Sequence, residues 1–576
     1  MAPPSMDFPG AGVGKSDAFG RQLAGIAAPY EADLSLLAQT QQLQTDMALR
    51  REAAWDVVLR VVDAVPLLGL AAAEDATEEI LLPGGVPQVP RFQTWYGVDD
   101  FKRMFKKLYK DLGPEGRAQR LPFDEAALAE AIEWNAVAAD RSERWPLERF
   151  LKHVKELGVC EPDVPDDECA MSLQSNFSGA TSGNTRITYS PGTMLHLLRN
   201  YGAILECLEG LPTLSIEQSP ENEDENFSYC FQSEFPSDAV LIKAHWIRAD
   251  FGRKMPAFDT DAEALIAVTG PGMSADWAEG DRETDPTSDE VFTIRLRNQD
   301  TYRLSGLHIM TKELRHWMWI TLWWSDKPDV DFGADRPAAF AALHPVWSHY
   351  KMGVTVDYEE GDTNLLSRFA ENPTLAAAIQ ATAIDGLTWS SNPYIEHGRG
   401  NARTNCIGCH QHGGSEAGYD LDDDGTLDPF DLELVIDNDQ LFPSNGRTQI
   451  RSLFPSEYLW STHRIDNLAQ VIKSEVNHFE FEDKDTPEVR ALNVLALTPD
   501  ASQGQKLFAI NCTPCHGGDG SGTTLAPSLY DRVPGLTDFE VAKTLITGKD
   551  VMPTWSHLAD QNLADLRAFL RQTFDN

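Results

Sequence analysis

The five-residue pattern Cys-x-x-Cys-His occurs twice in this chain of 576 residues. The first copy is Cys406-Ile-Gly-Cys409-His410 and the second is Cys512-Thr-Pro-Cys515-His516. Two thiols at this spacing can each form a thioether with one vinyl group of a haem, and the adjacent histidine then becomes the proximal ligand of the iron. A single copy could also be a redox or zinc-binding Cys-x-x-Cys motif that histidine follows by chance. Two copies in one chain predict two covalently bound haem c groups.

Composition and charge narrow the class of protein. With 42% apolar residues the chain is globular, and its length predicts about two to four domains. No apolar run is long enough to cross a bilayer. The formal net charge of −41 argues against binding to nucleic acid or anionic membranes, and it would attract a redox partner protein with a basic docking surface.

The haem motifs also indicate a compartment, because haem is attached to this motif outside the cytoplasmic membrane. We therefore expect a periplasmic or extracellular protein. Residues Met1–Gly20 lack a basic region followed by an apolar core, so the expected leader is absent from this sequence.

Changes in residue periodicity divide the chain into five predicted regions. Residues 1–90 form a poorly ordered tail (residues 1–30) and a helical segment, and residues 91–235 form a helical region. Alternating β-branched and aromatic residues in region 236–330 predict an antiparallel sheet of at least four strands, arranged as a small sandwich or barrel. Residues 331–499 form the mainly helical first haem region, and residues 500–576 form an all-α module. The expected fold class is multidomain α+β.

The boundaries of individual elements follow from the same patterns. The expected strands are Ala239–Arg248, Val291–Arg297, Tyr302–Thr311 and Trp317–Trp324. The expected helices before them are Phe101–Leu112, Asp124–Ala139, Leu147–Leu157 and Thr193–Glu209.

Four cysteines lie outside the haem motifs, namely Cys160, Cys169, Cys207 and Cys230. In an oxidising compartment they can form two disulfides, with three possible connectivities. The expected pairs are Cys160–Cys169 and Cys207–Cys230, because each closes a short loop. Four buried free thiols are the alternative.

The segment between the haem motifs contains an acidic loop, Asp420–Asp431, with the spacing of an EF-hand calcium site. Gly425 permits the sharp turn that brings the oxygen ligands around one cation. The predicted ligands of one Ca²⁺ are Asp420, Asp422, Asp424, Thr426 and Asp431. Aspartate at the twelfth position resembles the calcium loops of dockerin modules. A solvated acidic loop is the alternative.

Residues 500–576 resemble a monohaem cytochrome c domain over their whole length. Gln503–Asn511 matches the first helix of that family, with Gly504, Leu507 and Phe508 where it meets the last helix, Gln561–Phe574. Pro527 stands where the family has a proline loop beside the proximal histidine. Met552, in a Met-Pro-x-Trp context 36 residues beyond His516, stands where the family has its axial methionine. The resemblance implies His516/Met552 ligation, which leaves no open position on the iron and indicates electron transfer at this second haem.

The sixth ligand of the first haem is less constrained. No methionine follows His410 at a comparable spacing, so the candidates are another histidine, a different side chain, water, or none. His463 and His478 lie downstream, but His308 is preferred. It shares one face of an expected strand with Gly306, whose small size would admit a large planar group. A hydrogen-bonded histidine with no ligand role is the alternative.

The central region carries a second resemblance. Lys243-Ala-His-Trp246, Gly306-Leu-His308-Ile-Met-Thr-Lys312 and Trp317-Met-Trp319-Ile-Thr321 resemble a family of largely uncharacterised bacterial c-type cytochromes. Together with Phe92-Gln-Thr-Trp-Tyr and Asn392-Pro-Tyr-Ile, the similarity covers about residues 90–410. It implies a β-rich domain before a haem motif and supplies no substrate.

These observations favour a di-haem cytochrome that transfers electrons. The alternative is a haem oxidoreductase of peroxidase or oxygenase type with the first haem as the reactive centre, and with His308, Arg399 or Arg403 in its distal pocket. A binding module whose haems exchange electrons with a captured ligand is a third possibility. The sequence identifies no catalytic residue.

Overall fold

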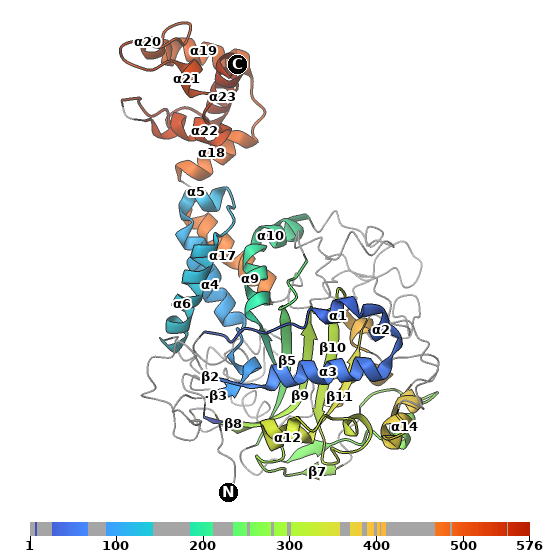
Figure 1. Ribbon diagram of the computed structural model, residues 1–576. Helices are drawn as coiled ribbons and strands as arrows, with labels where there is room; N and C mark the ends of the chain where they lie inside the picture. Colours follow the sequence, from blue (N-terminus) through green and yellow to red (C-terminus); the bar gives the residue numbers. More distant parts are fainter. Residues whose placement is uncertain are drawn as a thin grey trace, which may run out of the picture. The chain divides into compact units, whose positions relative to one another are not determined.

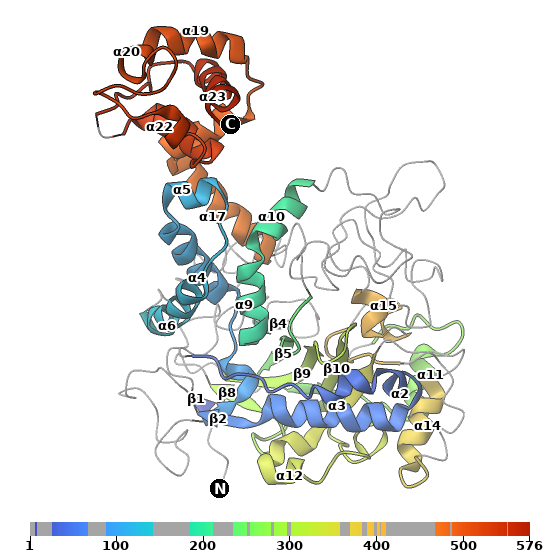
Figure 2. The same ribbon diagram turned by 45° about the horizontal axis from the view of Figure 1, so that its top comes forward.

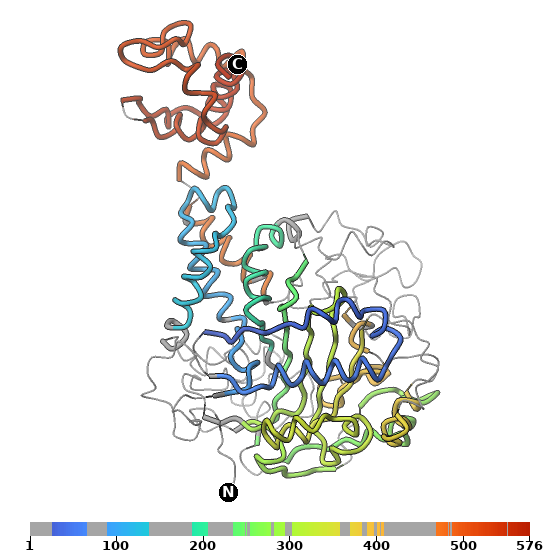
Figure 3. Tube along the Cα trace, viewed as in Figure 1, coloured from blue at the N-terminus to red at the C-terminus, as the bar shows by residue number. Residues whose placement is uncertain are grey.

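The structure is a computed structural model that divides into two units by its internal contacts. Unit 1 comprises Met1–Phe105 and Asp124–Ile472, and unit 2 comprises Lys106–Phe123 and Lys473–Asn576. The finer division into five regions stays a prediction. The structure describes the residues coloured in Figure 3, which are 6–7, 26–66, 88–141, 185–210, 234–249, 254–277, 282–295, 301–356, 369–382, 389–396, 400–403, 405–410, 467–483, 486–549 and 551–575.

Unit 1 is organised around a seven-stranded sheet in the described part of the chain (Figure 1). Strands β8, β9, β10 and β11 are neighbours in that order, β1 extends the edge beyond β8, and β5 joins β4 to β9. All pairs are antiparallel except β1 with β8. The strands are β1 (Met6–Asp7), β4 (Thr185–Tyr189), β5 (Val240–Arg248), β8 (Thr293–Arg295), β9 (Thr301–Thr311), β10 (Met318–Trp324) and β11 (Tyr350–Thr355).

The predicted antiparallel sheet is present, but within the described residues it is one open sheet, and the predicted sandwich or barrel is wrong. Helix α3 (Met47–Val62) crosses in front of the strands in Figure 1. Helix α15 (Cys406–His410) lies next to β10 in Figure 2, and its His410 ring contacts the ring of Trp319. Other segments therefore cover the sheet where a sandwich would need a second sheet. Every residue of β10 is buried, as expected for a strand covered on both faces.

The remaining elements of unit 1 are two small sheets, several helices and four 3₁₀ turns in the described residues. Two small antiparallel sheets pair β2 (Ala64–Pro66) with β3 (Gln88–Pro90) and β6 (Met255–Ala257) with β7 (Arg282–Thr284). The helices are α1 (Ser35–Ala38), α2 (Thr40–Thr45), α6 (Glu125–Arg141), α9 (Pro191–Arg199), α10 (Tyr201–Gly210), α11 (Ala262–Thr269), α12 (Phe340–Leu343) and α14 (Pro373–Thr382), with 3₁₀ turns η3 (Arg91–Thr94), η6 (Asp331–Gly333), η7 (Pro345–His349) and η8 (Asn401–Arg403).

The predicted helices at 124–139 and 101–112 correspond to α6 and α4 (Val98–Asp111), and the single helix predicted at 193–209 is divided at Asn200 into α9 and α10. The expected helix Leu147–Leu157 lies outside the described residues. The predicted disorder of residues 1–30 is wrong for residues 26–30. Ala28 and Tyr30 are buried there, and the indole nitrogen of Trp95 donates to the carbonyl oxygen of Ala28 at 2.9 Å.

Unit 2 is helical. Its elements are α5 (Gly113–Ala118), α18 (Pro487–Ala496), α19 (Ala501–Asn511), α20 (Thr513–His516), α21 (Leu529–Arg532), α22 (Asp538–Thr547) and α23 (Asp560–Phe574), and α4 and α17 (Asn467–Asp483) are each divided between the two units. Among the helices that the structure describes, none is both long enough and apolar enough to span a membrane.

The first and last helices of the C-terminal module cross closely at Gly504. A Cβ atom at this position would lie 2.0 Å from the carbonyl oxygen of Asp565 in α23, so only glycine permits the approach. Phe508 packs there against Phe569 and Phe574. The predicted contact of the two helices is confirmed, and the same core extends to α18, where Ala491 is fully buried.

Candidate haem sites

In unit 2, the second Cys-x-x-Cys-His motif presents its histidine in the form that binds iron. The Nδ1 atom of His516 lies 3.0 Å from the carbonyl oxygen of Pro527. A hydrogen bond to this carbonyl places the proton on Nδ1 and leaves Nε2 free to coordinate, as is usual for histidine ligands. Gly522 adopts φ 93°, and its backbone nitrogen donates to the carbonyl oxygen of His516 at 2.9 Å. The Pro527 loop is thereby held against the motif, as the resemblance predicts.

The loop around Met552 is also specified by a glycine. Gly548 ends α22 with φ 72°, and a Cβ atom on it would lie 2.5 Å from the carbonyl oxygen of Met552. The backbone nitrogen of Met552 donates to Lys549 at 2.8 Å, and that of Trp555 donates to Leu545 at 2.9 Å. The side chain of Met552 packs against the hydrophobic core that includes Cys512. The fold thus holds a thioether sulfur and a coordinating imidazole in one small module.

In unit 1, three rows of residues across β5, β9, β10 and β11 form a surface that we call the haem-one face. Directly paired residues of antiparallel strands point to the same side of a sheet. The rows are Leu241–Met310–Trp319–Thr355, Lys243–His308–Thr321–Gly353 and His245–Gly306–Trp323–Lys351.

The first haem motif lies on this face. The Nδ2 atom of Asn392 donates to Thr321 Oγ1 at 2.9 Å and to the carbonyl oxygen of Leu322 at 2.8 Å, which fixes residues 389–396 over the sheet. Ser390 Oγ is 3.7 Å from Cys406 Sγ, and the ring of His410 contacts the ring of Trp319 with 4.6 Å between centroids. His410 therefore contacts the sheet directly, and Cys406 contacts the segment 389–396 that lies on the sheet.

His308 lies in the middle row of the haem-one face. Its Nε2 atom is buried, has no hydrogen-bond partner among the described residues, and lies 3.8 Å from Glu396 Oε1. Burial, together with the charges of Lys243 and His410, holds the pKa of His308 well below its usual value, so the imidazole is neutral. A buried polar atom without a partner is unfavourable in a folded protein. A neutral imidazole with a free Nε2 that is electrostatically coupled to His410 fits the sixth ligand of a haem.

Glu396 was not predicted. Burial raises the pKa of its carboxyl to about 7, against the opposing effect of the hydrogen bond from the Asn392 nitrogen. Glu396 directly follows the Asn392-Pro-Tyr-Ile segment that carries the family resemblance. This adjacency was the one feature of the sequence that could have pointed to Glu396 as a site residue.

Two details of the predicted site need correction. Gly306 does not provide space for a planar group, because a Cβ atom there would lie 2.9 Å from Ile395 Cδ1. Its small size admits the segment 389–396 instead. The guanidinium of Arg403 donates to three carbonyl oxygens at and beyond the end of α11, so it is committed to that helix terminus rather than to a distal pocket.

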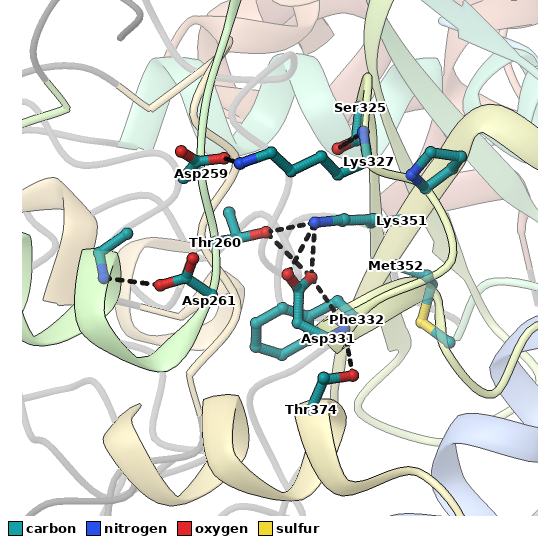
Figure 4. A network of polar contacts seen from close by, with 12 residues as sticks. Asp259, Thr260, Asp261, Ser325, Lys327, Asp331, Phe332, Lys351, Met352 and Thr374 are labelled. Atoms are coloured by element: carbon teal, nitrogen blue, oxygen red, sulfur yellow. Dashed lines mark hydrogen bonds and ion pairs between the residues drawn. The ribbon is translucent and has the colours of Figure 1, made fainter.

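A buried ion pair lies in the third row of the same face (Figure 4). Lys351 Nζ is 2.7 Å and 2.8 Å from the two carboxylate oxygens of Asp331, and 3.1 Å from Thr260 Oγ1. The backbone nitrogen of Asp331 donates to Thr374 Oγ1 at 2.8 Å. Burial raises the pKa of Asp331 and lowers that of Lys351, and their mutual attraction opposes both shifts. The pair joins β11 to η6 and α14.

Other predicted sites are not covered by the structure. The calcium loop Asp420–Asp431, His463 and Arg399 lie outside the described residues, as do Cys160, Cys169, Cys230 and the side chains of Cys207 and Cys409. His478 lies on α17, where its ring contacts that of Phe479.

The close helix crossing, the His516–Pro527 contact and the Met552 loop define a module of the cytochrome c class. Residues 499–570 match the family model described as cytochrome C oxidase, cbb3-type, subunit III. The chain is also similar to the Cbb3-type cytochrome c oxidase subunit FixP of Rhizobium meliloti (strain 1021), with 26% identity over 264 residues. That similarity covers 40% of this chain and 81% of FixP, so it extends beyond the C-terminal module. No solved structure matches the chain.

The C-terminal module is therefore a cytochrome c domain with covalently bound haem c, and the chain is a c-type cytochrome that acts in electron transfer. The resemblance of the central region to uncharacterised bacterial cytochromes stays a prediction.

Proposed function

We propose that the chain is a di-haem c-type cytochrome that transfers electrons outside the cytoplasm. Haem one is attached in unit 1 and haem two in the cytochrome c domain of unit 2. The proposed attachment residues are Cys406 and Cys409 for haem one and Cys512 and Cys515 for haem two, and the proposed iron ligands are His410 with His308 and His516 with Met552.

The observation that carries this proposal is the state of His308. It is neutral, its Nε2 has no hydrogen-bond partner among the described residues, and it shares the haem-one face with His410. His410 and His308 would together occupy both axial positions of haem one, which would then exchange electrons without binding substrate.

The two ligand sets give the transfer a direction. Methionine ligation raises the potential of haem two relative to a haem with two histidines. With these ligands, haem two would have the higher potential and would accept electrons from haem one for delivery to a partner protein. The net charge of −41 favours a partner with a basic surface. The name of FixP, a cytochrome c oxidase subunit, supports electron delivery as the role of the shared module.

Two further features belong to the proposal. We propose that the loop Asp420–Asp431 binds one Ca²⁺ in a structural role near haem one, because its oxygen ligands have the spacing of a calcium loop. The pairs Cys160–Cys169 and Cys207–Cys230 form disulfides, as expected for a protein outside the cytoplasm.

One observation favours the alternative, a haem oxidoreductase with haem one as the reactive centre. The carboxyl of Glu396, with a pKa of about 7, lies 3.8 Å from His308 and could move a proton at that haem. This function requires His308 to leave the iron or never to bind it.

A His308→Ala variant separates the two functions. We expect haem one to become high-spin and to bind cyanide, while haem two keeps the weak near-infrared band of methionine ligation. The matched control is His344→Ala, which removes a half-buried histidine whose Nδ1 accepts from the Val346 nitrogen in the same unit. A low-spin haem one in the His308→Ala protein would show that another group is the ligand. A high-spin haem one in the unaltered protein would favour the oxidoreductase.

A further inference from the structure

Arg490 of α18 joins two separate parts of unit 2. The residue after it, Ala491, is fully buried in the core of the C-terminal module, so the backbone of α18 is fixed at this point. The helix is also held to α22 by an ion pair in which Glu488 Oε1 lies 3.3 Å from Lys543 Nζ. It precedes residues 499–570, which match the family model, so the contacts of Arg490 come from outside the matched region.

The guanidinium group of Arg490 holds the segment that follows Met552. Its Nε atom donates to Asp560 Oδ1 at 2.8 Å. Its Nη2 atom donates to the carbonyl oxygen of Leu558 at 2.6 Å, and its Nη1 atom donates to the carbonyl oxygen of Ser556. Arginine can make these contacts together because its donors form a rigid planar fork. A single side chain therefore fixes both the end of the methionine loop and the first residue of α23.

We propose that Arg490 is a positioning residue for Met552, an inference that rests on the proposed ligation of haem two by His516 and Met552. The start of the methionine loop is fixed by Gly548 and by the hydrogen bond from the Met552 nitrogen to the carbonyl oxygen of Lys549. Arg490 fixes its end. A loop tied at both ends has fewer conformations open to it than a loop tied at one end, so its methionine leaves the iron less readily.

The test is displacement of Met552 by imidazole in the oxidised full-length protein with both haems bound. It is followed by the loss of the weak near-infrared band of methionine ligation. The variants are Arg490→Gln and Arg490→Lys, of which the second keeps the charge but not the planar fork. The matched controls are Arg571→Gln and Arg571→Lys. Arg571 makes the same kinds of contact in the same module, but with the carboxylate of Asp538 at the start of α22 and with two carbonyl oxygens before that helix.

We expect haem two of the Arg490→Gln protein to bind imidazole about tenfold more tightly, because hydrogen bonds to a charged group are stronger than ordinary ones. Arg490→Lys should show a smaller change in the same direction. Both Arg571 variants should bind imidazole as the unaltered protein does, even where their urea midpoints fall as far. Equal imidazole affinities of the Arg490 variants and their Arg571 controls would overturn the proposal. A missing near-infrared band in the unaltered protein would instead refute Met552 as the ligand, and with it the proposed function.

Discussion

Replacing Lys351 with methionine should destabilise unit 1 strongly. The side chains of Lys351 and Asp331 are only 1% and 2% exposed, and the ammonium group contacts both carboxylate oxygens. Without it, the carboxylate of Asp331 keeps hydrogen bonds from Thr260 and from the Phe332 nitrogen but has no opposing charge within contact distance among these partners. A buried charge that loses its partner is among the most destabilising changes in a protein core.

The expected loss is about 3–5 kcal/mol of unfolding free energy, the usual result of breaking a buried ion pair from one side. With a urea slope of about 3 kcal/mol per M, the midpoint should fall by about 1 M or more. The variant Asp331→Asn removes the charge. Asparagine, like aspartate, readily adopts the positive φ of 43° at this position. The Lys351→Met/Asp331→Asn double variant should recover about 2–3 kcal/mol relative to the sum of the single losses.

The pH dependence provides a second check. Loss of Lys351 raises the pKa of Asp331 further, and a carboxyl whose folded pKa exceeds its unfolded value favours the folded state at low pH. The Lys351→Met protein should therefore lose less stability relative to the unaltered protein at pH 5 than at pH 7, since lower pH protonates the unpaired carboxyl.

The assay is urea unfolding of the haem-loaded protein, followed by circular dichroism at both pH values. The control is Lys327→Met, which breaks the more exposed pair with Asp259 and should change stability by about 1 kcal/mol or less. The reasoning is refuted if Lys351→Met is no less stable than this control, or if the two single losses simply add in the double variant.

Two more changes test other parts of the structure. Gly504→Ala should lower the unfolding free energy of unit 2 by about 1–3 kcal/mol or more and reduce binding of haem two but not haem one, since its Cβ atom would collide with Asp565. The control is Gly535→Ala, because the nearest neighbour of a Cβ atom there is 3.8 Å away. Equal melting temperatures of the two variants would contradict the account. Burial lowers the pKa of His196 to about 4. Because its unfolded pKa is about 6.5, unit 1 should lose about 3 kcal/mol of stability as the pH falls from 6.5 to 4. His196→Gln should reduce that slope in urea titrations, and an unchanged slope would show that other groups cause it.

Three of the four strands that form the haem-one face could be predicted from the sequence. Alternating residues placed β5, β9 and β10 correctly, and that alternation put His308 on the side that meets the haem motif. Strand β11 was missed because all six of its residues are buried, including Lys351, so it shows no contrast between an inner and an outer face. Gly306 was interpreted wrongly because nothing local indicates that Ile395 packs against it.

Contacts between residues that lie far apart in the sequence could not be predicted from local residue patterns. Residues 106–123 belong to unit 2, where Arg117 pairs with Asp483, 366 positions further along the chain, and Lys543 pairs with Glu115. No periodicity or motif signals such pairs. The unusual properties of Glu396 likewise arise from tertiary burial, whereas the cytochrome c module could be predicted because its motif, proline loop and methionine occur at family spacing.

Counting haem per chain, together with the low-temperature EPR and near-infrared spectra of the oxidised protein, tests the central claim most directly. The account predicts two haems per chain, both low-spin, with the methionine band arising from haem two alone. One haem per chain, or a high-spin signal that shifts on addition of cyanide, would contradict it.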